Sequence, residues 1–200
     1  MVVRPRLVVL LVIIVTLVYP LPEVTEISIM SSPIESAQDQ DLEVVRLVEE
    51  VEEGLEELET HKRTEKWQGL SAKTGLTIAL INHIYTLCAE KEIPPELLLA
   101  LIETESDFDP NAVNERSGAT GLGQFLPSTA EWIASINDLP YSYDLLKDPY
   151  YNVELMILYL DHLYKREQDW RTVLSLYVGH GYRGRYSRYT ETVLSRSKSY

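Results

Sequence analysis

The chain has 200 residues, 45% of them hydrophobic, so it can form one domain with its own core and some additional segments. Its formal net charge of −13 argues against nucleic acid as the main partner, because proteins that bind nucleic acid present basic surfaces. The single cysteine cannot form an intramolecular disulfide, and the four histidines lack ligand spacing, so neither a metal nor another cofactor is predicted.

Residues 1–22 have the composition of an export segment. Arg4 and Arg6 precede an uncharged run, 7–21, that is rich in Val, Leu and Ile. As a helix this run would cover roughly 22 Å, less than the 30 Å or so of a bilayer core, which favours a cleaved signal peptide. No Ala-x-Ala-like site or lipobox cysteine follows it, which favours an uncleaved signal anchor with its arginines inside. In both cases we expect an extracytoplasmic protein, either anchored to the membrane or secreted.

An acidic amphipathic helix is predicted over residues 41–60, after a flexible spacer at 23–40. Apolar residues in it recur at steps of 4, 3, 4 and 3, which is the spacing of a heptad seam. These residues are Val44, Val48, Val51, Leu55 and Leu58. The seam predicts self-association as a coiled coil, but like charges would repel a parallel partner, so a solvated helix or an acidic spacer is an equal alternative. Residues 61–72 are expected to form a linker to a domain at 73–200.

A helix that carries one candidate catalytic carboxylate is predicted from Pro95 to about Ser106. Proline suits the first helical position, and the apolar run 97–102 follows. With Leu97 set at 0° and about 100° per residue, the apolar stripe centres near 70°, and Glu105 falls at about 80°. Glu103, near 240°, is expected to point into solvent.

The predicted position of Glu105 favours its protonated form. Half protonation near pH 6 requires the pKa of the glutamate to rise from its usual value of about 4.3, which takes roughly 2 kcal/mol. The helix dipole supplies about 0.3 to 1 kcal/mol in the last turn, so burial must supply the rest. Such a carboxyl group suits a general acid in a cleft. The alternative is a structural acid that closes the helix and binds an arginine or backbone amides.

The residues after Glu105 form motifs at fixed distances. Glu-Ser at 105–106 is followed by Phe-Asp-Pro at 108–110, Gly-Ala-Thr-Gly-Leu-Gly-Gln at 118–124 and Pro-Ser-Thr-Ala at 127–130. This string resembles the lytic transglycosylase domain of the lysozyme-like superfamily, in which Glu-Ser ends a helix before Phe-x-Pro, Gly-Ala-x-Gly-Leu-Met-Gln and Pro-x-Thr-Ala. The resemblance covers roughly residues 73–195. It implies a mainly α, lysozyme-like domain, preceded by the signal or membrane helix and the acidic stalk.

The resemblance also implies roles for individual residues. Glu105 would be catalytic, and Ser106, Gln124, Tyr177 and Tyr189 would bind substrate. Tyr177 would be the family tyrosine that hydrogen-bonds the catalytic glutamate, whereas Tyr189 would line the cleft.

The chain departs from the family pattern at three of the matched positions. Gly123 stands where methionine is usual, Met156 where glycine is usual and Val178 where asparagine is usual. The change at Gly123 means that a wall of the cleft is missing or is filled by another side chain. Near Val178 the family glycine could correspond to Gly179 or to His180.

By resemblance the substrate is peptidoglycan, cut between N-acetylmuramic acid and N-acetylglucosamine with formation of a 1,6-anhydro ring. Glu105 would act first as acid and then as base, without a second carboxylate. One alternative is a hydrolytic muramidase, in which Asp107, Asp109 or Glu115 supplies a second carboxylate at about 5 to 9.5 Å. The other is a peptidoglycan-binding protein without catalytic activity.

Overall fold

The computed structural model describes residues 35–184 and 187–200, with side chains from residue 44 onward. The described residues are helical and contain no strand beyond isolated β-bridges at Val113, Thr120 and Phe125. The predicted mainly helical fold is therefore confirmed. The predicted signal or anchor segment, 1–22, lies outside the described residues. None of the described helices has an apolar stretch long enough to cross a bilayer.

The helix α2, Glu35–Thr74, differs from the predicted boundaries. It contains the predicted acidic helix at 41–60, but it begins inside the expected spacer and continues through the expected linker at 61–72. The linker prediction is wrong because this segment packs. Leu70 is buried in the core and Trp67 lies against it. The chain divides into two compact units, Met1–Leu55 and Glu56–Tyr200, so these last turns belong to the second unit.

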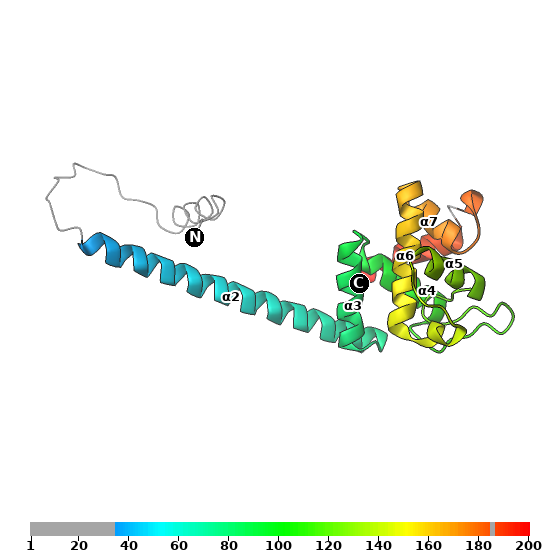
Figure 1. Ribbon diagram of the computed structural model, residues 1–200, viewed down its shortest axis with the longest axis horizontal. Helices are drawn as coiled ribbons and strands as arrows, with labels where there is room; N and C mark the ends of the chain where they lie inside the picture. Colours follow the sequence, from blue (N-terminus) through cyan, green and yellow to red (C-terminus); the bar gives the residue numbers. More distant parts are fainter. Residues whose placement is uncertain (1–34, 185–186) are drawn as a thin grey trace. The chain divides into compact units, whose positions relative to one another are not determined.

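The second unit is built from six further α-helices and three short 3-10 helices. They are α3 Ile78–Glu90, α4 Pro95–Ser106, α5 Pro127–Ile136, α6 Pro149–Glu167, α7 Trp170–Tyr177 and α8 Arg188–Arg196, with η1 Tyr143–Lys147, η2 Tyr182–Gly184 and η3 Ser197–Ser199. Helix α6 (yellow in Figure 1) runs through the unit, and α3, α5 and α7 pack against it. Proline occupies the first turn of α4, α5 and α6, where its missing N–H leaves no donor unsatisfied.

Helix α4 is buried on all its sides rather than along one stripe. All six residues from Leu97 to Ile102 are in the core, because α3 packs on one side of α4 and α8 with η3 on another. Glu103 is consequently not the solvated charge that the sequence predicted. Its Oε2 accepts a hydrogen bond of 2.9 Å from the Tyr200 hydroxyl, and its Oε1 lies 3.7 Å from Nε of Arg196.

The glycine-rich loop at 118–124 is fixed to α6 by one buried amide. Oδ1 of Asn152 accepts a hydrogen bond of 2.8 Å from the backbone N–H of Gly123. Nδ2 of Asn152 donates to the carbonyl of Leu146 at 2.8 Å and to that of Thr120 at 3.3 Å. Since Gly121 has a φ of +82° and faces the same amide, only a residue without a side chain fits there.

Substitution of Gly121 by Ala should destabilise the fold much more than the same substitution at Gly75. Both glycines have positive φ, but a Cβ at Gly121 would overlap Asn152 and the Leu146 carbonyl, whereas nothing lies within 4 Å of one at Gly75. We expect a loss of about 1 to 2 kcal/mol for Gly75→Ala from the backbone alone. Overpacking adds about 1 to 3 kcal/mol for Gly121→Ala. Denaturant unfolding measures both, and equal losses would contradict this account of the loop.

Candidate active site

Glu105 lies in the last turn of α4 and is half-buried. The helix ends one residue later because Asp107 adopts a left-handed conformation, with φ of 52°, and its N–H bonds the carbonyl of Glu103. Asp109 then closes the turn, since its Oδ1 accepts a hydrogen bond of 2.8 Å from the N–H of Asn111. The helix therefore ends directly after Glu105 and Ser106.

Burial raises the pKa of Glu105, and a hydrogen bond from Tyr189 partly opposes the shift. The direction of the predicted shift is therefore confirmed. No other carboxylate in the described part of the chain contributes to it. Desolvation is thus the cause that favours the protonated acid.

Two tyrosines meet at this carboxylate, and the sequence prediction gave the hydrogen bond to the wrong one. The Tyr189 hydroxyl donates to Oε1 of Glu105. The Tyr177 hydroxyl instead donates to the carbonyl of Gly123, at 2.8 Å. Residue 123 has no side chain, so its backbone is open to the phenol. Burial and the charge of Glu105 raise the pKa of both tyrosines, so both remain protonated donors.

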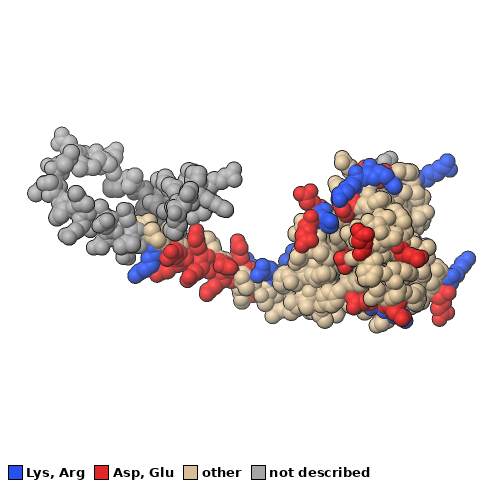
Figure 2. Space-filling model, viewed as in Figure 1, with Lys and Arg blue, Asp and Glu red and all other residues tan. Residues whose placement is uncertain are grey.

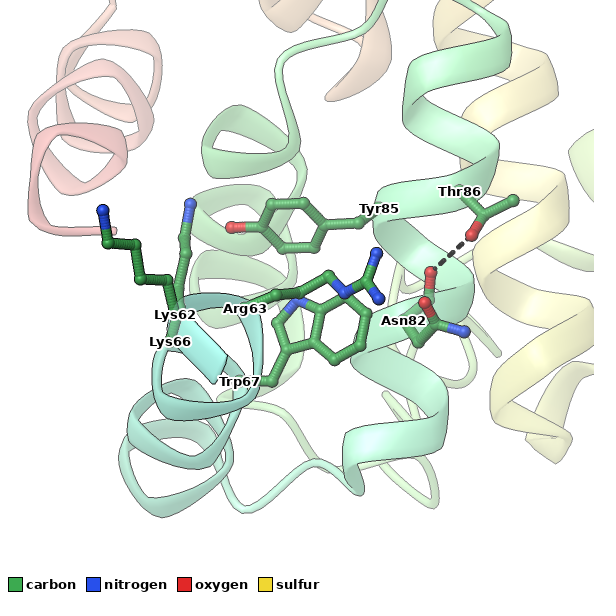
Figure 3. Close-up of a pocket in the computed structure, with 7 residues that line it drawn as sticks. All are labelled: Lys62, Arg63, Lys66, Trp67, Asn82, Tyr85 and Thr86. Atoms are coloured by element: carbon green, nitrogen blue, oxygen red, sulfur yellow. Dashed lines mark hydrogen bonds between the residues drawn. The ribbon is translucent and has the colours of Figure 1, made fainter. Parts of the chain in front are cut away.

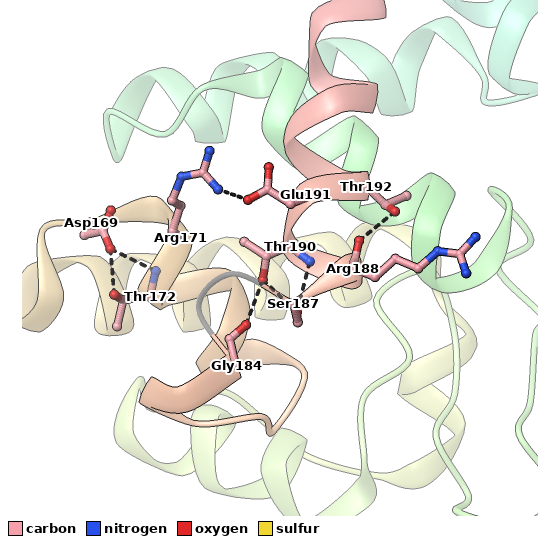
Figure 4. A network of polar contacts seen from close by, with 9 residues as sticks. All are labelled: Asp169, Arg171, Thr172, Gly184, Ser187, Arg188, Thr190, Glu191 and Thr192. Carbon is pink, nitrogen blue, oxygen red and sulfur yellow. Dashed lines mark hydrogen bonds and ion pairs between the residues drawn. The ribbon is translucent and has the colours of Figure 1, made fainter.

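Polar contacts at the start of α8 hold Tyr189 in position (Figure 4). Ser187 caps the helix, because its Oγ accepts a hydrogen bond of 3.3 Å from the N–H of Thr190. The buried Thr190 in turn bonds the carbonyl of Gly184 at 3.5 Å, and Glu191 pairs with Arg171 of α7. Helix α8 is thus tied to α7 near its first turn.

The far end of α8 is tied to α4 itself. Nη1 of Arg196 donates a hydrogen bond of 3.2 Å to Oγ1 of Thr104, the residue that precedes Glu105. Contacts at both ends of α8 therefore fix the distance between the phenol of Tyr189 and the carboxylate of Glu105.

Gln124 and Ser106 use part of their hydrogen-bonding capacity for contacts within the chain. Nε2 of Gln124 donates to the carbonyls of Ala112 and Gly121, each at 3.1 Å. Its Oε1 makes no hydrogen bond among the described residues, so the amide could act toward a ligand as an acceptor. The Ser106 hydroxyl donates to the carbonyl of Ile102 at 3.2 Å, so toward a ligand it can only accept a hydrogen bond through its oxygen lone pairs.

Met156 fills the space that the missing side chain at Gly123 leaves. A Cβ at residue 123 would lie 2.6 Å from Cγ and 2.7 Å from Sδ of Met156, and 2.7 Å from the Tyr177 hydroxyl. Met156 is fully buried. In this chain α6 therefore supplies the thioether at this place, and the loop supplies the glycine.

Tyr177 also belongs to an aromatic cluster that the sequence did not predict. Its ring centroid lies 5.4 Å from that of Tyr159 and 6.0 Å from that of Phe125. Tyr159 in turn contacts Trp132 edge-on at 6.2 Å, and Trp132 is 42% exposed. Because these residues come from separate segments, no spacing in the sequence indicates that they meet.

The chain after Tyr177 turns at Gly179 rather than at His180. Val178 ends α7, and Gly179 takes a φ of 79° with nothing within 4 Å of an added Cβ. Of the two residues that could match the family glycine, Gly179 has the conformation that requires one.

The carboxylates proposed for a hydrolytic mechanism are all exposed. Asp107 and Asp109 lie on the turn after α4, and Asp109 is engaged in the turn by its bond to the N–H of Asn111. Glu115 lies on the following loop. Neither Asp107 nor Glu115 is linked to Glu105 by a hydrogen bond among the described residues.

A mainly helical fold with one half-buried glutamate at the end of a helix agrees with the class that the sequence motifs indicated. The chain belongs to the transglycosylase SLT domain family, whose model matches residues 84–197. This match confirms the resemblance found in the sequence motifs. A comparison with curated proteins finds no match.

Two solved lytic transglycosylases are similar in structure. An inactive mutant of Slt from Pseudomonas aeruginosa has 20% sequence identity and a TM-score of 0.52, over 58% of this chain and 23% of that protein. The 70 kDa soluble lytic transglycosylase SLT70 from Escherichia coli has 25% identity and a TM-score of 0.48, over 58% of this chain and 18% of that protein. The first supports the fold. The chain spans less than a quarter of the length of either enzyme.

The two tyrosines predict different effects on the ionisation of Glu105. Tyr189→Phe removes the hydrogen bond that stabilises the carboxylate, so the pKa of Glu105 should rise further. Tyr177→Phe is the matched control, because its hydroxyl bonds Gly123 instead. Carboxyl-carbon NMR titration of the two variants and the wild type measures the shift. A larger rise in Tyr177→Phe would reverse the assignment of the two phenols.

The exchange at Gly123 and Met156 predicts strong coupling between the two positions. Gly123→Met alone should clash with Met156, and Met156→Gly alone should lose about 2 to 5 kcal/mol through the cavity it leaves. The double variant restores one methionine and one glycine, so it should be more stable than either single variant. A double-mutant cycle in denaturant measures the coupling. Additive losses would show that the two side chains do not share this space.

Proposed function

We propose that the protein is a peptidoglycan lytic transglycosylase with Glu105 as its acid and base. The observation that carries the proposal is the half-buried Glu105, whose pKa is raised by burial and which accepts a hydrogen bond from Tyr189. A group that must give and then take a proton works best when its pKa lies near the working pH. Membership of the transglycosylase SLT domain family supports peptidoglycan as the substrate.

In the first step the protonated carboxyl of Glu105 donates its proton to the oxygen that joins the muramyl sugar to the next N-acetylglucosamine. The bond from C1 of the muramyl sugar to this oxygen breaks, and the positive charge that develops on the ring lies near the new carboxylate. Tyr189 stabilises this carboxylate by its hydrogen bond.

In the second step the carboxylate of Glu105 takes the proton from the C6 hydroxyl of the same sugar. O6 then bonds to C1, and the 1,6-anhydro ring closes without an added water. The carboxyl group is again protonated, so the residue is ready for another cycle. Ser106 and the free acceptor of Gln124 are the groups that we assign to substrate binding, together with Tyr177 and Tyr189.

The two rival functions require a different site around Glu105. A hydrolytic muramidase needs a second carboxylate about 5 to 9.5 Å from the first, and the exposed positions of Asp107, Asp109 and Glu115 give it little support. A binding protein without activity would need a damaged cleft. The filling of the space at Gly123 by Met156 argues against such damage.

The proposed substrate places the protein outside the cytoplasm. The basic, apolar segment at 1–22 supports export, either as a signal anchor that holds the chain to the membrane or as a signal peptide. Peptidoglycan strands and the membrane are therefore the partners that we propose.

Digestion of purified peptidoglycan tests the proposed chemistry. A fragment of residues 56–200 contains the whole described core. We expect it to release fragments with anhydro ends, each one water lighter by mass spectrometry than a reducing end. Glu105→Gln should lower this activity about 10²- to 10⁴-fold, because the substituted amide cannot transfer the proton.

Glu103→Gln is the control, since Glu103 lies on the same helix but faces Tyr200 and Arg196. It should keep most of the activity. Reducing ends would indicate the muramidase, and retained binding without release would indicate the binding protein. Undiminished activity of a folded Glu105→Gln variant would remove Glu105 from the mechanism.

A further inference from the structure

A groove that lies mostly before the family-matched residues combines cations with aromatic rings. It encloses about 430 Å³ between the last turns of α2 and the helix α3. Its residues, shown in Figure 3, are Lys62, Arg63, Lys66, Trp67, Asn82, Tyr85 and Thr86. All but two of them precede residue 84, where the match to the family begins.

The polar groups of this groove are incompletely paired. Lys62 and Arg63 are exposed and form no ion pair among the described residues, whereas Lys66 lies 3.6 Å from Glu96. The Tyr85 hydroxyl is buried without a hydrogen bond of normal geometry, and the Lys66 ammonium lies 4.9 Å from the centre of its ring. Arg63 lies over the Trp67 ring at 5.4 Å. A ligand with both negative charge and apolar surface would satisfy these groups.

The earlier part of α2 has these properties, and its apolar side chains are exposed. Residues 43–59 contain eight glutamates and one arginine, and Figure 2 shows acidic side chains along this part of α2. Between the charges lie apolar side chains that are about half exposed. They are Val44 at 49%, Val51 at 58%, Leu55 at 56% and Leu58 at 47%. Such a row of exposed aliphatic side chains favours a helical partner.

We propose that residues 43–59 of one copy dock into the groove of a second copy. Along α2, Glu35–Thr74, the acidic segment directly precedes the turns that form the groove wall. We assign the occupant to a second copy, because its acidic segment carries the charge that complements the groove. The inference does not depend on the proposed enzymatic activity.

Charge also decides the direction of the pairing. Residues 60–74 hold four basic side chains and one acidic one, so the charge of α2 reverses along its length. Parallel copies would set glutamates against glutamates, whereas antiparallel copies set each acidic segment against the other's Lys62, Arg63 and Lys66. An antiparallel pair is isologous, so both grooves are filled and the assembly closes as a dimer.

Charge-reversed variants of the full chain test the proposed dimer. Sedimentation equilibrium in a density-matched detergent gives the dissociation constant without a signal from the micelle. Lys62→Glu with Arg63→Glu should weaken the wild-type dimer about 10- to 100-fold, and so should Glu52→Lys with Glu59→Lys. A mixture of the two double variants should restore the dimer, because each then meets its opposite charge.

Arg116→Glu with Lys147→Glu is the matched control, since it makes the same change of charge at exposed sites outside the groove. It should leave the dimer intact. A monomeric wild-type chain, a dimer that persists in the groove variant, or a mixture that stays monomeric would each overturn the proposal. A monomer whose groove variant no longer pellets with peptidoglycan would also overturn it, in favour of an anionic wall polymer.

Discussion

The hydrogen bond from Tyr189 to Glu105 joins the first and last helices that build the candidate active site. Burial raises the pKa of Glu105, whereas the hydrogen bond from the phenol lowers it and so favours the charged form. The bond is effective only if α8 stays in place against α4. The contacts of Ser187, Thr190 and Arg196 provide that support from backbone caps and neighbouring helices.

The glycine-rich loop shows how a packing requirement can move from one segment to another. In this chain α6 supplies the methionine and the loop supplies the glycine. The backbone carbonyl of Gly123 is then free to receive the Tyr177 hydroxyl. Tyr177 is thereby bound to the glycine-rich loop, and its ring continues into the cluster with Phe125 and Tyr159. The same exchange explains why an apparent loss in the motif need not open the site.

Helix α2 changes from an acidic segment at 43–59 to a basic one at 60–74. Its last turns pack on the core through Trp67 and Leu70. The earlier turns leave aliphatic side chains exposed beside a row of glutamates. Exposed apolar side chains along a charged helix mark a surface that can pair with a partner, and the basic groove has the complementary charge.

The local pattern of the sequence determined the helical class, the helix that ends at Ser106 and the direction of the pKa shift of Glu105, which it also made the candidate catalytic acid. These properties depend on periodicity, proline and glycine positions and motif spacing, which are all local. Only the tertiary structure decided which phenol reaches Glu105, that Met156 fills the space at Gly123 and that Glu103 meets Tyr200. Each of these contacts joins residues far apart in the chain, so it depends on how whole helices pack and not on the residues nearby in sequence.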